Sequence, residues 1–186
     1  MAKKKSKKMD VTKLVITIVV IALAVLTICT MFMPVFTSKA TIAGRESVSH
    51  IKGVDVITAA FKGETSSDLS AGANSLISLK NSDDAGFVTG LFCWMYFLSV
   101  ILSIAILVFA VLKLFGMKFN LVNSILGIAL VALAIVAFIC SFVVAGKFGS
   151  VDLGSLVTGK TVAGVGSYLL LLSVACGGTN LYLSKK

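Results

Sequence analysis

The stretch Leu14-Val-Ile-Thr-Ile-Val-Val-Ile-Ala-Leu-Ala-Val-Leu-Thr-Ile-Cys-Thr-Met-Phe-Met-Pro-Val-Phe36 decides the fold class. It runs for 23 residues without Asp, Glu, Lys, Arg or His. About 20 apolar residues are enough to cross the roughly 30 Å hydrocarbon core of a bilayer. Because unpaired backbone groups in lipid cost several kcal/mol each, such a stretch must satisfy its own hydrogen bonds as a helix.

Three further stretches have the same character, so the chain has four predicted spans: 14–36, 87–112, 119–145 and 161–183. Their apolar runs are continuous, whereas the strands of a transmembrane barrel alternate apolar and polar residues. The predicted fold class is all-α membrane. It is a bundle of four transmembrane helices with a small extracytoplasmic cap, made of short strands or helix, between the first two spans.

Composition supports the membrane class over the whole chain. Of 186 residues, 58% are hydrophobic and 13% are charged, about half the charged share of a typical soluble domain. The mean hydropathy is +1.03, which also excludes intrinsic disorder. The 23-residue first run exceeds the apolar region of a cleavable signal peptide, so we expect a retained span, although Ser38-Lys39-Ala40 would suit cleavage.

The formal charge of +9 lies almost entirely on one side of the predicted spans. Ten lysines and one aspartate in residues 1–13, 113–118 and 184–186 net +9, whereas the loop 37–86 nets −1 and the loop 146–160 nets +1. Since basic loops stay in the cytoplasm, this sidedness predicts that both termini are cytoplasmic and that both larger loops are outside. The predicted order is a basic cytoplasmic tail (1–13), a span (14–36), an extracytoplasmic cap (37–86), a span (87–112), a cytoplasmic turn (113–118), a span (119–145), a short outer loop (146–160), a span (161–183) and a tail (184–186).

The basic tail is predicted to bind anionic lipid headgroups rather than nucleic acid. A lysine run beside a span gains roughly 1 kcal/mol per residue near an anionic surface. No aromatic residue is interleaved to stack bases. The predicted headgroup contacts are Lys3, Lys4, Lys5, Lys7 and Lys8. A specific cytoplasmic partner of the tail is the alternative.

The long loop carries the one predicted contact face for a partner. Residues 41–51 favour a weak hairpin, and residues 53–63 favour a short helix, in which Val54, Ile57 and Phe61 recur at helical spacing. We expect these three to contact a partner, or else to form the core of the cap. The apolar side of this helix would rest on the outer membrane surface or on the ends of the spans.

Three residues near the span ends carry separate expectations. Pro34 is expected to end the first helix, since proline cannot continue the hydrogen-bond ladder. Trp94 and Tyr96 are expected in an outer aromatic belt. Ser82 or Asp83 is expected to cap the second span, as small polar residues do.

Small residues on the spans predict close helix packing. They serve packing within one chain or, as the alternative, homo-oligomerisation. They are Gly86, Gly90, Ser99, Ser103, Ala137, Ser141, Ala145, Gly164, Ser173 and Gly177.

No motif predicts an enzyme, a cofactor or a metal. Residues 154–161 satisfy the P-loop expression G-x-x-x-x-G-K-[ST]. A P-loop follows a buried strand, however, and here a predicted span precedes it, so no nucleotide is expected. Cys29, Cys93, Cys140 and Cys176 all lie in spans, where packing is preferred over a copper site formed with nearby methionines. His50 is expected to be a solvated loop residue, and catalytic constellations are missing from the sequence.

The order of the parts resembles a family. Phe32-Met-Pro-Val-Phe36 ends the first span, a Gly53–Phe61 segment follows, and Gly164-Val-Gly-Ser-Tyr168 opens the last span. This is similar to small uncharacterised four-span membrane proteins of Gram-positive bacteria. The resemblance implies a multi-pass protein of the bacterial cytoplasmic membrane, and it implies no activity. The layout also resembles that of claudin-like tetraspan proteins, which implies a β-rich first loop. The claudin tryptophan and cysteine signature is missing from residues 37–86, so no function is carried over.

Two functions follow as hypotheses. The first is an integral membrane protein with a structural or accessory role. It would bind a membrane-protein partner or assemble laterally through its cap and its small-residue helix faces. The alternative is a passive transporter or channel subunit formed by oligomerisation. Ion-coupled transport is disfavoured, because no ionisable residue lies within a predicted span.

Overall fold

The structure is a computed structural model that describes residues 11–42, 45–117, 119–148, 150–152 and 157–185. Its four long helices are α1 (Val11–Cys29), α4 (Gly86–Leu114), α5 (Asn120–Lys147) and α6 (Val165–Lys185). Each is long and apolar enough to cross a membrane, α1 together with the following 3-10 turn, η1 (Thr30–Phe32). The fold class predicted from the sequence is confirmed.

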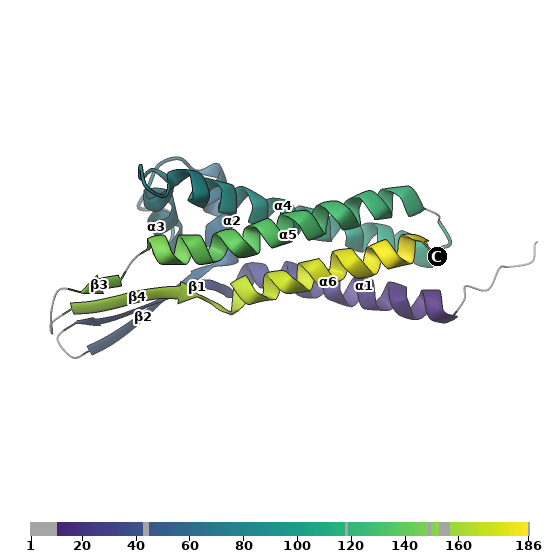
Figure 1. Cartoon of the computed structure of the whole chain (residues 1–186), viewed down its shortest axis with the longest axis horizontal. Helices are drawn as coiled ribbons and strands as arrows, with labels where there is room; N and C mark the ends of the chain where they lie inside the picture. Colours follow the sequence, from purple (N-terminus) through teal and green to yellow (C-terminus); the bar gives the residue numbers. More distant parts are fainter. Residues whose placement is uncertain (1–10, 43–44, 118, 149, 153–156, 186) are drawn as a thin grey trace, which may run out of the picture.

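The four long helices form a ring in which α1 packs on α4 and α6, and α5 packs on the same two helices. Two clusters of buried side chains fill the ring, one near each end. The beginning of α1 and the end of α6 lie at the same end of the bundle (Figure 1). We call this the terminal end, and the opposite end the cap end.

The cap contains strands as well as helices, where the sequence had left the choice open. Its helices are α2 (Gly53–Phe61) and α3 (Ala71–Lys80), and its strands are β1 (Pro34–Ile42), β2 (Arg45–Lys52), β3 (Ser150–Asp152) and β4 (Val157–Ala163). The sheet order is β2-β1-β4-β3, with antiparallel neighbours throughout. The sheet extends beyond the bundle, while α2 and α3 lie beside the cap end of α4 (Figure 1).

Both loops contribute to one sheet, which corrects the view of residues 146–160 as a plain short loop. Strand β4 continues to Ala163, and α6 begins only at Val165. The residues from Thr161 to Ala163, predicted to open the fourth span, therefore lie in the sheet. The chain passes from β4 to α6 through Gly164, whose N–H donates to the Val35 carbonyl (2.6 Å).

The first helix ends earlier than the sequence predicted. The α-helix stops at Cys29 and one 3-10 turn follows, so Pro34 lies outside the helix as the first residue of β1. That is a position where a strand tolerates proline. A β-bulge follows between Pro34 and Phe36. Both Val35 and Phe36 are buried, although neighbouring side chains in a regular strand would point to opposite faces.

Two other expectations about the cap end are wrong. Helix α4 has Ala85 at its N-cap without a side-chain cap, and the Ser82 hydroxyl instead donates to the Leu79 carbonyl (2.7 Å). Tyr96 is fully buried rather than part of an exposed belt, whereas Trp94 remains 42% exposed. The Tyr96 ring faces inward because α2 and the base of β1 cover that side of α4.

Candidate interaction surface of the cap

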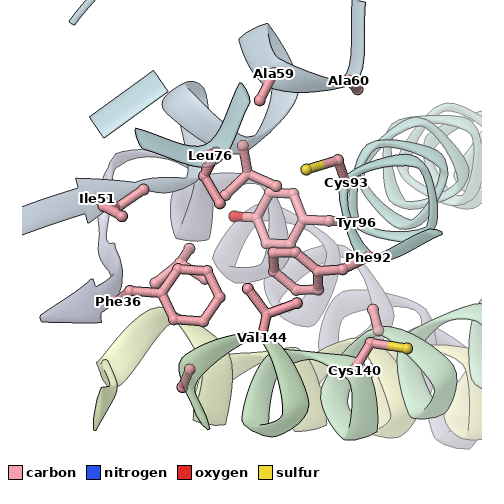
Figure 2. Close-up of a cluster of buried hydrophobic side chains, with 14 of the residues drawn as sticks. Phe36, Ile51, Ala59, Ala60, Leu76, Phe92, Cys93, Tyr96, Cys140 and Val144 are labelled. Atoms are coloured by element: carbon pink, nitrogen blue, oxygen red, sulfur yellow. The ribbon is translucent and has the colours of Figure 1, made fainter. Parts of the chain in front are cut away.

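The joint between the cap and the bundle is a packed apolar cluster. Side chains from the hairpin, α2, α3, α4 and α5 converge there (Figure 2). Phe36 is fully buried in this cluster, with its ring centroid 5.4 Å from that of Phe92 and 5.7 Å from that of Phe148. Buried apolar area of this kind stabilises by about 25 cal/mol per Å². The sheet is therefore fixed to the bundle at its base.

Gly53 makes the closest approach at this joint. Its N–H donates to the Met33 carbonyl (3.2 Å), which joins the start of α2 to the end of η1. A Cβ added at Gly53 would collide with the Tyr96 hydroxyl and lie 2.7 Å from the Met31 Cα. The Tyr96 hydroxyl lies 3.3 Å from the Thr30 hydroxyl, within hydrogen-bond distance. A residue without a side chain is therefore required at the start of α2.

Helices α2 and α3 run parallel and are joined by side chains at both ends. At their N-termini, Asp55 accepts from the Lys52 N–H (2.8 Å) and from the Ser70 hydroxyl, and Ser70 caps α3 by accepting from the Ala73 N–H. Asp55 is the N3 residue of α2, and its carboxylate satisfies the N–H of the N-cap residue, Lys52. The two contacts of Asp55 fix the N-termini side by side.

At the C-terminal ends, Lys80 performs the corresponding role. Its ammonium group donates to the carbonyls of Ala59 (3.0 Å), Ala60 (3.4 Å) and Lys62 (3.2 Å). A cation at the carbonyl end of a helix also interacts favourably with the helix dipole. Asn81 adds a bond from its amide to the Gly63 carbonyl (2.8 Å). These contacts fix the start of the loop between the two helices. The composition of that loop, which is rich in Gly and Ser, would by itself suggest mobility.

The predicted contact residues lie on the outward side of α2. The face packed on the cluster consists of Gly53, Val56, Ala59 and Ala60. Val54 and Phe61 are 41% and 58% exposed, and Ile57 is half-buried against the edge of the cluster. Their contact with a partner stays a prediction, while the core of the cap is formed mainly by their neighbours.

Beyond its base, the sheet has two exposed faces. Register pairs Lys39 with both Val48 and Lys160, and pairs Thr37 with both His50 and Val162. Directly paired residues share a face. We call the face formed by these six residues the lysine face. Val48 and Val162 are 48% and 41% exposed on it, beside cationic side chains.

The opposite face carries hydroxyl groups. Ser38 pairs with Ser49 and with Thr161, and the Ser38 and Thr161 hydroxyls lie 2.7 Å apart. The sequence did not predict these two faces, because half of the sheet surface comes from residues 157–163. The prediction assigned residues 157–160 to the short outer loop and residues 161–163 to the fourth span. The period-two pattern around Lys160 and Val162 was the available signal.

His50 lies in β2 rather than in an unstructured loop. It is exposed, with its Nδ1 atom 3.3 Å from the Thr37 hydroxyl. In the segment that matches the P-loop expression, the described residues, 157–161, form part of a strand. Lys160 and Thr161 lie within β4, whereas a P-loop lysine opens a helix.

Most of the predicted packing residues are used inside the bundle. Those that are buried on the spans are Ser99, Ser103, Ala137, Ser141, Ala145, Ser173 and Gly177. Gly164 is buried against the Pro34 carbonyl. Gly86 is packed against the end of α3, whereas an added Cβ at Gly90 would meet only the Lys80 side chain, at 4.0 Å. Gly177 lies at a close crossing with Gly127 of α5, and Gly127 was not predicted.

The four cysteines are free thiols. Cys29 is exposed on α1, while Cys93, Cys140 and Cys176 are buried. Within the described residues, His, Cys, Asp and Glu form no group of three or more that could hold a metal ion.

The polar residues of the terminal end lie between helices. Asn180 donates from its amide to the Asn123 carbonyl (2.8 Å), and the Lys113 ammonium donates to the Leu183 carbonyl (3.0 Å). Lys3, Lys4, Lys5, Lys7 and Lys8 lie outside the described residues, so their predicted headgroup contacts stay predictions. Comparisons with protein-family models, curated proteins and solved structures found no match.

Proposed function

We propose that the chain is a structural or accessory membrane protein whose cap binds a membrane-protein partner or a second copy of itself. The observation that carries the proposal is the sheet made from both loops. It extends past the bundle and exposes Val48 and Val162 among lysines on its lysine face. On this face the two exposed valines would supply an apolar centre of contact, and the lysines would lie in its polar rim.

The cap is a better candidate for association than the small-residue helix faces. Those faces are already occupied within one chain, as the burial of Ser99, Ala137 and Ser173 indicates. Lateral assembly through them would require the bundle to open. The proposal therefore places association at the sheet.

The proposed orientation has the cap outside and the terminal end in the cytoplasm of a bacterium. Lys13, Lys113 and Lys185 all belong to the terminal end, which supports this orientation through the preference of lysine for the cytoplasmic side. A membrane-impermeant maleimide tests it in intact cells. Val48→Cys should be labelled and Phe115→Cys should not, and the reverse pattern would overturn the orientation.

Photo-cross-linking in native membranes tests the interaction. A benzophenone amino acid at Val48 or Val162 should give a discrete protein adduct on gels. The same probe at Leu121, which is 74% exposed at the terminal end, is the control and should give no such adduct. Protein adducts from Leu121 alone, or none from either sheet position, would contradict the proposal.

Native mass spectrometry identifies which association occurs. A homo-oligomer that survives Val48→Asp would place association away from the sheet and favour the alternative of an oligomeric pore. A complex that is lost in Val48→Asp, and kept in a control carrying Leu121→Asn, would support the sheet as the contact.

A further inference from the structure

Three aromatic residues form an exposed patch where α2 meets α4. Phe61 ends α2, and its ring centroid lies 5.2 Å from that of Trp94 and 4.7 Å from that of Phe97. Trp94 and Phe97 lie 5.9 Å apart, and all three pairs are edge-to-face. We call these residues the aromatic triad. Phe61 is 58% exposed and Trp94 is 42% exposed, so the triad is packed internally but uncovered on its outer side.

The triad is continuous with the side of α4 that faces away from the bundle. Exposed apolar residues follow Trp94 along this side at helical spacing: Leu98, Ile101, Val108 and Val111. On a helix that crosses a membrane, such a stripe is the lipid-facing side. Phe61 therefore extends a lipid-facing surface from the bundle onto the cap.

The position of the triad along α4 matches the edge of the hydrocarbon. The 19 helical steps from Trp94 to Lys113 span about 28 Å, close to the roughly 30 Å thickness of the core. From Phe87 to Lys113 the helix spans about 39 Å. This length exceeds the hydrocarbon core, so Phe87 and Lys113 cannot both lie at its two boundaries. Trp94 is therefore the residue at the level of the glycerol groups, where tryptophan is enriched.

A second aromatic group lies at the cap end on α5 and α6. Tyr168 packs edge-to-face on Phe138 and Phe142, and Tyr168 is 53% exposed three residues after the start of α6. Aromatic side chains thus lie at the cap end on two separate helix pairs, as expected where rings contact the lipid interface.

We infer that the aromatic triad is a docking site for the phospholipids of the leaflet at the cap end, and that it holds the end of α2 in the membrane interface. Acyl chains pack on the stripe below Trp94, and the glycerol region contacts Phe61. The first two turns of α4, from Gly86 to Cys93, then stand outside the hydrocarbon and pack on α2 and α3. The lipid surface fixes the height of the cap above the membrane.

Trp94 is the only tryptophan, so its fluorescence reports the depth of the triad directly. The full chain is reconstituted in phosphatidylcholine vesicles with bromine either near the carbonyl end or near the methyl end of the acyl chains. We expect the shallow bromine to quench Trp94 at least twofold more than the deep bromine. Stronger quenching by the deep bromine, or quenching only by iodide in the water, would overturn the inference.

A second probe tests α2 itself. Phe61→Trp in a Trp94→Phe background should also be quenched most by the shallow bromine, and a probe quenched by iodide alone would show that α2 lies off the membrane. Phe61→Ser in the native background should shift Trp94 emission to longer wavelength, whereas Phe115→Ser at the terminal end should leave it unchanged. A Trp94 shielded from both lipid and iodide in every variant would mean a protein covers the triad, and would equally reject the lipid site.

Discussion

Gly53 is the residue on which the position of the cap depends most. It is buried, and its missing side chain lets the start of α2 contact Met31 and the Tyr96 hydroxyl. Tyr96 in turn reaches the Thr30 hydroxyl in η1. One glycine thus allows η1, α2 and α4 to meet at a point.

Gly53→Ala should destabilise the protein by about 1–3 kcal/mol, because an added methyl in a packed site forces neighbours apart. Thermal unfolding in detergent measures this. Gly63→Ala is the matched control, since an added Cβ there meets nothing within 4 Å. Adding Tyr96→Phe should restore part of the loss by removing the nearest atom. Equal stability of the two alanine variants would refute the role of Gly53.

Lys80 acts at the same scale by completing the carbonyl end of α2. Lys80→Met should weaken α2 by roughly 1–2 kcal/mol, because three carbonyls lose a charged donor. Hydrogen exchange of the α2 amides is the measurement, and we expect faster exchange there. Lys62→Met removes an exposed lysine next to α2 and should leave exchange unchanged. The same acceleration in both variants would indicate a general charge effect.

Among the elements, α5 and α6 approach each other most closely at Gly127 and Gly177. An added Cβ at Gly177 would lie 2.7 Å from the Gly127 carbonyl, and one at Gly127 would lie 2.8 Å from the Gly177 carbonyl. Small residues allow such crossings between helices in membranes, where burial of apolar area from water gives no driving force.

Two neighbouring glycines on α6 should respond in opposite ways. Gly177→Ala should cost about 1–3 kcal/mol through overpacking. Gly178→Ala adds a Cβ in open space and should stabilise the helix by up to about 1 kcal/mol. Unfolding in mixed micelles, followed by circular dichroism, gives both values. A loss of stability in Gly178→Ala as large as that in Gly177→Ala would contradict the close crossing.

At the scale of the whole molecule, the pairing of β1 with β4 unites the two loops. Helices α1 and α6 continue into these strands, and the Val35 carbonyl also accepts from the Ser167 hydroxyl (2.8 Å). The sheet is therefore an extension of one side of the bundle. A partner bound to it would contact both loops at once.

Paired cysteines test this topology. Ser38→Cys with Thr161→Cys should form a disulfide under mild oxidation, because the two residues are directly paired and share a face. Opposed residues in antiparallel strands have a Cα separation that suits a disulfide. Lys39→Cys with Thr161→Cys places the thiols on opposite faces and should remain reduced. The polypeptide is cut between the two loops, and gel mobility then shows whether a disulfide still joins the two fragments. Cross-linking in the control pair alone would refute the register.

The prediction of α2 shows what local pattern can and cannot provide. Its extent follows from glycines at both ends and apolar residues at helical spacing, and the structure confirms the helix over Gly53–Phe61. Which side is buried could not be read from the spacing of Val54, Ile57 and Phe61. The packed side uses small residues such as Ala59 and Ala60, because α2 lies close against α4. The prediction that Tyr96 belongs to an outer aromatic belt was wrong for the same reason, because α2 covers this residue of α4.

The sequence by itself determined the four long helices and the common side of the basic residues. An apolar run in lipid has no other way to satisfy its backbone, and lysines seldom cross to the far side. Only the tertiary structure decided that β1 and β4 form one sheet, that Tyr96 is buried and that Phe61 packs on Trp94 and Phe97 of α4. Those features depend on contacts between residues distant in sequence, such as Ser38 and Thr161. Neither strand alone has a strong enough pattern to indicate its partner.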